Sequence, residues 1–191
     1  MGKIEVKKIT LFGKIVASSV SLYDFEKQLD GKLVSKTEVE LFKTFKSVVF
    51  DITEMLSKLH RSRFERLVDF DVAVFNALVN VRSRLVDASN NLSRDDWFLF
   101  WNIQTYSSGY KLPIAIIEVT DDGWAKSFGA EFQLIYNPET KVSNIGIELA
   151  YRKYISFNQP YITDHDTKRE IARKLFKNPA SGVVEVEIIT D

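Results

Sequence analysis

Acidic side chains gather around the strands that alternating apolar and polar residues predict in the second half of the chain. They are Glu118, Asp121 and Asp122 at the end of one run, Glu131 at the start of the next, and Glu148 on its partner. Antiparallel pairing would bring several of these carboxylates around one divalent ion, as in a metal-dependent nuclease. The alternative is that Asp121-Asp122-Gly123 forms a turn and that the glutamates line a solvated sheet face. Because a short acidic pattern has little specificity, we assign no metal ligand.

A second group combines basic and aromatic residues between positions 151 and 177. The candidates for nucleic-acid contact are Arg152, Lys153, Lys168, Arg169, Arg173, Lys174 and Lys177, together with Tyr154. Proteins that bind single-stranded nucleic acid use cations to contact its phosphates and aromatic rings to stack on its bases. The competing interpretation is that these cations form the solvated face of a helix and favour its C-terminal end.

The two histidines and the absence of cysteine limit the catalytic alternatives. A zinc site would need both His60 and His165 together with carboxylates. The cluster Thr163-Asp164-His165-Asp166-Thr167 is also typical of a helix start, and His60 is expected to be solvated at a turn. No nucleophile elbow or phosphate-binding glycine loop is present. The sequence therefore predicts no catalytic residue, no metal and no cofactor, and it favours a protein that is not an enzyme.

Composition sets broader bounds. The chain has 191 residues and a formal net charge of zero, which argues against a polyanion-binding field over the whole protein. It contains no run of apolar residues long enough for a transmembrane helix, and residues 1–8 lack the apolar run of a signal peptide. We therefore expect a single domain over 1–191 in a soluble cytoplasmic protein, without a membrane partner.

The elements that position these residues begin with a helical block, because 32–108 contains neither glycine nor proline. A capping-box pattern, Ser35-Lys36-Thr37-Glu38, starts a helix whose apolar stripe runs to Leu59. A second stripe, whose members include Val68, Phe75 and Val86, predicts a helix over 64–88, antiparallel to the first. Asp71 interrupts that stripe. Because an unpaired buried carboxylate is costly, the position predicts an ion pair with an arginine such as Arg82, a rotation or local break of the helix, or partial exposure.

Shorter elements flank this block. Before it, the pattern predicts a hairpin or two strands over 3–19 and a short helix over 22–29. After it come a third helix that starts at Ser93 and carries the apolar residues 97–101, a strand over 112–120 and a hairpin over 131–151. A capping box opens a further helix at Thr167, which ends at Asn178-Pro179, and a strand follows over 184–188. The run 97–101 is apolar on every side, so a buried strand is the alternative there.

These elements predict an α+β fold, in which a helical hairpin and short helices pack on an antiparallel sheet. The 14 Phe, 7 Tyr and 3 Trp supply more aromatic surface than a small sheet and a helix pair readily cover. We therefore predict a non-enzymatic binding or regulatory protein that acts through a protein partner and forms a homo-oligomer. Nucleic-acid binding by 151–177 is the second hypothesis, and the metal-dependent nuclease is the third.

Overall fold

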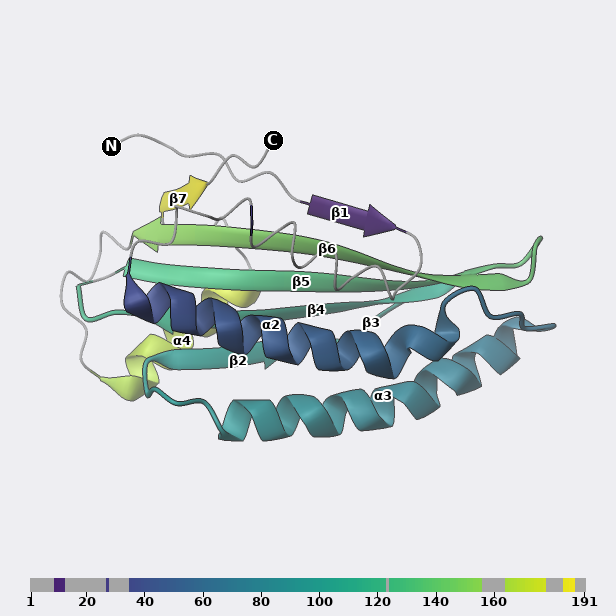
Figure 1. Cartoon of the computed structure of the whole chain (residues 1–191), viewed down its shortest axis with the longest axis horizontal. Coiled ribbons are helices and arrows are strands. Elements are labelled where there is room, and N and C mark those ends of the chain that lie inside the picture. Colours follow the sequence, from purple (N-terminus) through teal and green to yellow (C-terminus); the bar gives the residue numbers. More distant parts are fainter. Residues whose placement is uncertain are drawn as a thin grey trace.

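The architecture is α+β, with helices packed on an antiparallel sheet, as the sequence predicts (Figure 1). The computed structural model describes residues 9–12, 27, 35–122, 124–155, 164–177 and 184–187, with the backbone alone described at 9–12, 152–155 and 184–187. The predicted helix over 22–29 lies outside these residues apart from position 27. So does the predicted hairpin over 3–19, apart from the strand at 9–12.

The predicted helical hairpin is confirmed. Helices α2 (Lys36–Leu56) and α3 (Leu67–Asn90) run antiparallel across one face of the sheet (Figure 1). The first turn of α2 is capped as the sequence indicates, because Ser35 Oγ accepts a hydrogen bond from the Glu38 amide at 3.0 Å. A 3-10 turn (Ser57–Leu59) follows α2, and no strand interrupts 40–56 or 66–84.

The connection between the two helices is anchored to the sheet, so α3 begins later than residue 64. The Arg61 amide donates to the Ser143 carbonyl at 2.7 Å, and the Phe64 amide donates to the Lys141 carbonyl at 2.8 Å. His60, which the sequence predicts to be solvated, is half-buried, and its Nδ1 accepts from the Ile145 amide at 2.9 Å. The backbone amides of Arg61 and Phe64 therefore bond to strand β6 (Val142–Ile155) and to the turn before it, rather than within a helix.

The sheet is built from consecutive long hairpins with short strands at its margins. Its strands are β1 (Ile9–Phe12), β2 (Trp97–Trp101), β3 (Gln104–Tyr106), β4 (Gly109–Val119), β5 (Trp124–Asn137), β6 (Val142–Ile155) and β7 (Val184–Glu187). The order is β1-β6-β5-β4-β2, with β3 paired to β4 and β7 paired to β6. The predicted strands over 112–120, 131–151 and 184–188 are thus confirmed, and β5 and β6 are longer than expected.

The third helix predicted from Ser93 is wrong, because residues 97–101 form the edge strand β2. Trp97 and Leu99 join the core beneath α2 and α3, whereas Phe98 joins a second core beneath helix α4 (His165–Lys177). A strand presents alternate residues to opposite faces, so a segment covered on both faces is apolar throughout. That composition does not by itself distinguish a strand from a buried helix.

Helix α4 completes a third layer on the face of the sheet opposite α2 and α3. Its core contacts include Ala172 and Leu175, which pack with Ile117 and Val119 of β4. The helix begins two residues before the predicted capping box. Asp164 Oδ2 accepts from the Thr167 amide at 2.8 Å, so Asp164 caps the helix. A neighbouring carboxylate therefore takes the position that the pattern assigned to Thr167.

Helix α3 is continuous through Asp71, so the predicted break is absent, whereas the alternative of partial exposure is confirmed. The Asp71 carboxylate is half-buried and accepts a hydrogen bond from the Tyr110 hydroxyl at 2.7 Å. Its partner is thus a tyrosine of β4 rather than Arg82. Burial, followed by the hydrogen bond and the negative charge of Asp71, raises the pKa of Tyr110 to about 12.

This raised pKa predicts a pH dependence. The stabilising effect of neutral Tyr110 is complete below the usual tyrosine pKa of about 10 and is lost as the pH rises from about 10 to about 12. We expect Tyr110→Phe to lower the free energy of unfolding by about 1 kcal/mol near neutral pH. The difference from wild type should shrink across that alkaline window, as measured by urea unfolding. A difference that stays constant up to the end of the window would contradict the assignment.

Two glycines of the sheet provide a matched test of strand packing. A Cβ at Gly109 would lie 2.5 Å from the Leu134 carbonyl oxygen on the paired strand, whereas the nearest atom to one at Gly129 is 3.7 Å away. Gly109→Ala should therefore lower the free energy of unfolding by about 1–3 kcal/mol, because backbone on both strands must shift. Gly129→Ala should change it by no more than about 1 kcal/mol. Equal urea midpoints for the two variants would refute this packing.

Candidate functional site

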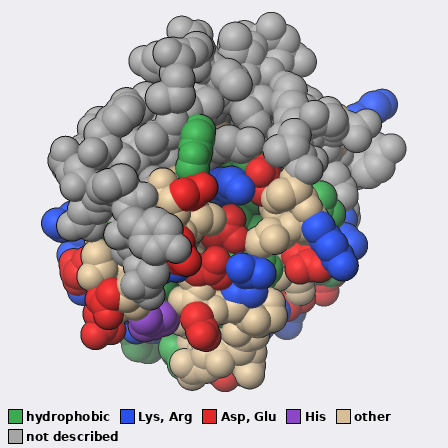
Figure 2. Space-filling model, turned by 90° about the vertical axis from the view of Figure 1, so that its left-hand side faces the viewer, with side chains coloured by type: hydrophobic (Ala, Val, Ile, Leu, Met, Phe, Trp, Pro, Cys, Tyr) green, Lys and Arg blue, Asp and Glu red, His purple; other side chains and the backbone are tan. Residues whose placement is uncertain are grey.

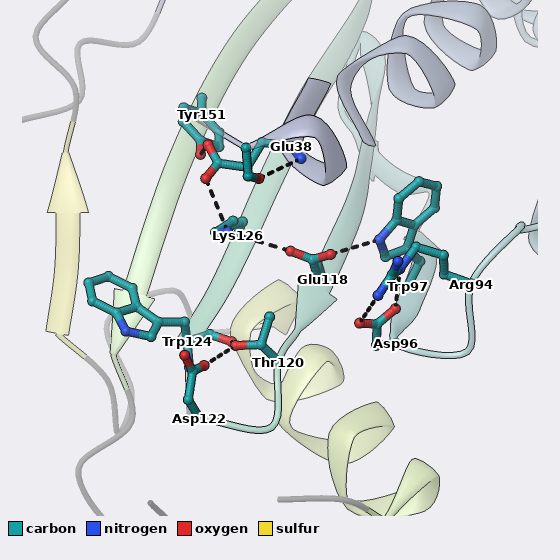
Figure 3. A network of polar contacts seen from close by, with 11 residues as sticks. Glu38, Arg94, Asp96, Trp97, Glu118, Thr120, Asp122, Trp124, Lys126 and Tyr151 are labelled. Carbon is teal, nitrogen blue, oxygen red and sulfur yellow. Dashed lines mark hydrogen bonds and ion pairs between the residues drawn. The ribbon is translucent and has the colours of Figure 1, made fainter. Parts of the chain in front are cut away.

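A buried polar network lies where the start of α2 meets the sheet (Figure 3). Glu38 of α2 and Glu118 of β4 are each 1% exposed. Lys126 Nζ of β5 lies 3.1 Å from Glu38 Oε1 and 3.6 Å from Glu118 Oε1. One ammonium group therefore serves two buried carboxylates, which would otherwise be costly to keep charged.

The remaining oxygens of both carboxylates also have donors (Figure 3). Trp97 Nε1 donates to Glu118 Oε2 at 3.0 Å, and the Tyr151 hydroxyl donates to Glu38 Oε2 at 2.9 Å. Burial, followed by the charge and hydrogen bond of Glu38, raises the pKa of Tyr151. Tyr151 consequently keeps its proton and remains a donor in the physiological range. The network joins α2 to strands β2, β4, β5 and β6.

The strand register explains why these side chains meet. Glu118 and Lys126 are direct partners across β4 and β5. Tyr151 lies opposite Phe128 on the neighbouring strand pair, and its ring stacks on Phe128 at 4.4 Å between centroids. The capping-box pattern finds Glu38 but does not predict its carboxylate in this network, because the pattern describes only local contacts.

The five carboxylates predicted around the strands do not converge on one site. Glu118 faces the α2 and α3 layer, whereas Glu131 and Glu148 face the opposite side of the sheet, directly across from each other on β5 and β6. Asp121 pairs with Lys168, and Asp122 accepts from Thr120. That hydrogen bond lowers the pKa of Asp122. Among the described residues, no group of three or more His, Asp or Glu side chains is placed to hold a metal ion.

A shallow hollow opens at the same end of the molecule, where acidic and basic side chains lie next to one another (Figure 2). It is lined by Ser93, Arg94, Asp95, Asp96, Asp121, His165 and Lys168. Arg94 binds Asp96 through Nε at 3.0 Å and through its terminal nitrogen at 3.2 Å. His165 Nδ1 lies 3.0 Å from the Asp95 carbonyl oxygen. The His165 contact attaches α4 to the segment that precedes β2, and the ion pair of Lys168 with Asp121 attaches it to the β4–β5 turn.

The basic residues predicted to bind nucleic acid are only partly gathered on one surface. Lys168 is buried, and Arg173 pairs with Glu170 at 2.6 Å. Arg169, Lys174 and Lys177 are exposed on α4. The other predicted residues, Arg152, Lys153 and Tyr154, lie where β6 pairs with β7, and their side chains are outside the described part of the chain.

The outward face of α3 carries an apolar stripe that sequence reasoning missed. Its members are at least 45% exposed: Val68, Val72, Phe75, Val79 and Val86. A separate stripe faces the core and comprises Phe70, Val74, Leu78, Val81, Leu85 and Ala88. The single stripe predicted over 64–88 includes Val68, Phe75 and Val86, which lie on the outward face. The available signal was that apolar residues occupy too many positions for one helix face.

No protein-family model, curated protein or solved structure matches this chain. Within the described residues, no helix combines the length and the apolar character needed to cross a membrane.

Removing the shared ammonium tests the buried network. Lys126→Met should lower the free energy of unfolding by about 3–5 kcal/mol, because it leaves two buried carboxylates without their cation. Adding Glu38→Gln and Glu118→Gln should recover a large part of this loss. Urea unfolding measures both effects when Lys126→Met is compared alone, with each glutamine substitution, and with both of them.

A surface lysine provides the matched control. Lys141 Nζ lies 3.0 Å from Glu65 Oε2 in an exposed ion pair. Lys141→Met should leave stability nearly unchanged, because exposed pairs are screened by solvent. A loss at Lys126 no larger than the loss at Lys141 would show that the network contributes little.

Proposed function

We propose that this chain is a non-enzymatic binding protein that acts through a protein partner docked on the outer face of α3. The observation that carries the proposal is the stripe of Val68, Val72, Phe75, Val79 and Val86, each about half-exposed or more on a regular helix. Isolated apolar side chains on a surface are ordinary, but a contiguous row is typical of an interaction site.

The residue types in the stripe support this role. Valine and phenylalanine are weaker helix formers than alanine, glutamate or lysine, by up to about 0.7 kcal/mol per residue. On the solvent side of α3 these residues gain little burial within the monomer, since Phe75 is 61% exposed and Val72 is 55% exposed. Their presence therefore favours a use outside the monomer, where a partner covers them and the hydrophobic effect stabilises the complex.

The polar features favour a structural role over catalysis. The carboxylates of Glu38 and Glu118 are already held by Lys126 and by ring and hydroxyl donors. In the hollow, Arg94 and Lys168 are paired with acids of the same chain. Groups engaged in this way hold α2 and α4 on the sheet. We therefore assign the network and the hollow to the scaffold that presents α3.

Nucleic-acid binding is the second proposal, and it rests on the exposed cations Arg169, Lys174 and Lys177 along α4. Binding of this kind would weaken steeply with salt, because each neutralised phosphate releases a counterion. Replacing all three by alanine would abolish it. Fluorescence anisotropy with a single-stranded oligonucleotide at two salt concentrations distinguishes this alternative from the first proposal.

The proposed location is the cytoplasm. Fluorescence microscopy of a tagged chain in the source cells checks it.

Phe75→Glu tests the proposed docking face. The charge lies in the middle of the stripe and should abolish capture of the partner, whether that partner is another protein or a further copy of this chain. Asn80→Glu adds the same charge to an exposed position of α3 outside the stripe and should leave capture unchanged. Both variants should keep the helical circular-dichroism spectrum of wild type.

The readout combines light scattering of the purified chain with affinity capture from an extract of the source cells. If wild type and Phe75→Glu show the same molar mass and retain the same proteins, the outer face of α3 is not a binding surface. Loss of the partner in both variants would equally contradict a role specific to the stripe.

A further inference from the structure

We propose that the partner on the outer face of α3 is a second copy of this chain, whose α3 packs antiparallel to the first about a two-fold axis. This inference rests on the proposed function, because it identifies the occupant of the same surface. Three observations carry it: the spacing of the stripe, the position of Arg82 within that spacing, and the charges that flank the stripe.

The stripe has the spacing of a helix–helix seam. With Arg82 included, the seam consists of Val68, Val72, Phe75, Val79, Arg82 and Val86. The steps between successive members are four, three, four, three and four residues. Steps that alternate between four and three are those of a heptad repeat, whose average spacing of about 3.5 residues keeps one helix in contact with another along its length. The core of the monomer uses the other side of α3, where Phe70, Val74 and Val81 are buried. The two sides of α3 are thus available for different contacts.

An antiparallel pair aligns this seam with itself. Phe75 then faces Val79 of the second copy, and Val68 faces Val86 of the second copy. Arg82 faces Val72 of the second copy, so the remaining seam position is filled as well. Such an interface is isologous, because each contact occurs twice about the axis, and it closes at two copies.

The charges beside the seam distinguish the two possible directions. In the seam repeat, Asp69 and Asp71 flank Val72, one on each side. In the antiparallel arrangement, Arg82 of one copy therefore lies over Val72 and between these two carboxylates of the other copy. A parallel arrangement places Arg82 beside Arg82, and it places Asp71 of each copy on the same side of the seam as Asp69 of the other copy. Complementary charge in one direction and repulsion in the other direction favour the antiparallel pair.

The monomer leaves Arg82 available for this contact. Arg82 is exposed, and within the described part of the chain it has no ion-pair partner, whereas Arg84 pairs with Asp51 of α2 at 2.6 Å. Asp69 binds Arg66 on the surface. Asp87 lies near Arg82 in the C-terminal half of α3, but its position in the repeat faces away from the seam, so it does not flank the contact. Arg82 and the two aspartates Asp69 and Asp71 therefore meet only when two copies pair.

The absence of cysteine from the chain makes the arrangement directly testable by cross-linking. Val68 and Val86 are 18 residues apart on α3, which corresponds to about 27 Å along the helix axis. A disulfide requires Cα atoms within about 7 Å. In the antiparallel dimer, Val68→Cys alone and Val86→Cys alone should form little disulfide dimer under mild oxidation. An equal mixture of the two variants should form it efficiently, as seen by non-reducing electrophoresis.

Each other outcome contradicts the inference. Efficient cross-linking of each variant with itself would show a parallel pair. No cross-linking in the mixture, with light scattering at the monomer mass of 22.0 kDa, would show that the second copy is not the occupant. In the latter case, capture that Phe75→Glu abolishes would still support a different protein on this face, so the two proposals fail separately. Adding Phe75→Glu to both cysteine variants provides the control for random collision.

Charge exchange tests the role of Arg82. Arg82→Glu should weaken the dimer by about tenfold or more, because it places a carboxylate between Asp69 and Asp71 of the second copy. Asp69→Lys in the same chain should restore much of the affinity, as measured by sedimentation equilibrium. Weakening that Asp69→Lys does not relieve would contradict the antiparallel register. So would a dimer whose affinity does not change with Arg82→Glu.

Discussion

The sheet must be covered on both faces near β2 and β4, and the placement of every long helix follows from this constraint. Strand β2 sends Trp97 into the core beneath α2 and α3 and Phe98 into the core beneath α4. Because α4 packs opposite the helical hairpin, the buried strands form the middle of three layers (Figure 1). The polar contacts around Lys126 and Lys168 stand at one end of these layers, where they attach α2 and α4 to the strands between them.

The same constraint explains what sequence reasoning could and could not predict. Local signals sufficed for the start of α2, where Ser35 caps the helix, and for the β5–β6 hairpin, where apolar and polar residues alternate. They failed at 97–101, because burial on two sides removes the alternation that identifies a strand. At the start of α4, the capping box favours Thr167 and the acidic cluster before it offers Asp164. The sequence does not decide between them, since both residue types favour that position, and Asp164 is the cap.

The candidate surfaces were harder to predict, because they depend on contacts between distant segments. Glu38 and Tyr151 are 113 residues apart in the chain and meet only when the start of α2 is packed on the sheet. The apolar stripe of α3 poses the opposite problem. Its residues are close together in the sequence, but whether they are exposed depends on how α3 packs on the rest of the chain. Only the position of α3 over the sheet shows that Phe70 faces inward and that Phe75 faces outward. A pattern of apolar residues cannot by itself separate a core face from a docking face.

The outer edge of β6 is shared by two short strands from distant parts of the sequence. β1 pairs with it over Gly146–Leu149 and β7 over Arg152–Ile155, with four residue pairs each. By contrast, β4, β5 and β6 follow one another along the chain, so their pairing closes only short loops. The pairing of β1 with β6 closes a long loop, which costs more entropy, and it forms only a short ladder of hydrogen bonds. We therefore expect β1 to be among the last elements to dock during folding. The order of assembly thus runs from the central hairpins outward, and the amides of β1 should exchange with solvent before those of β5.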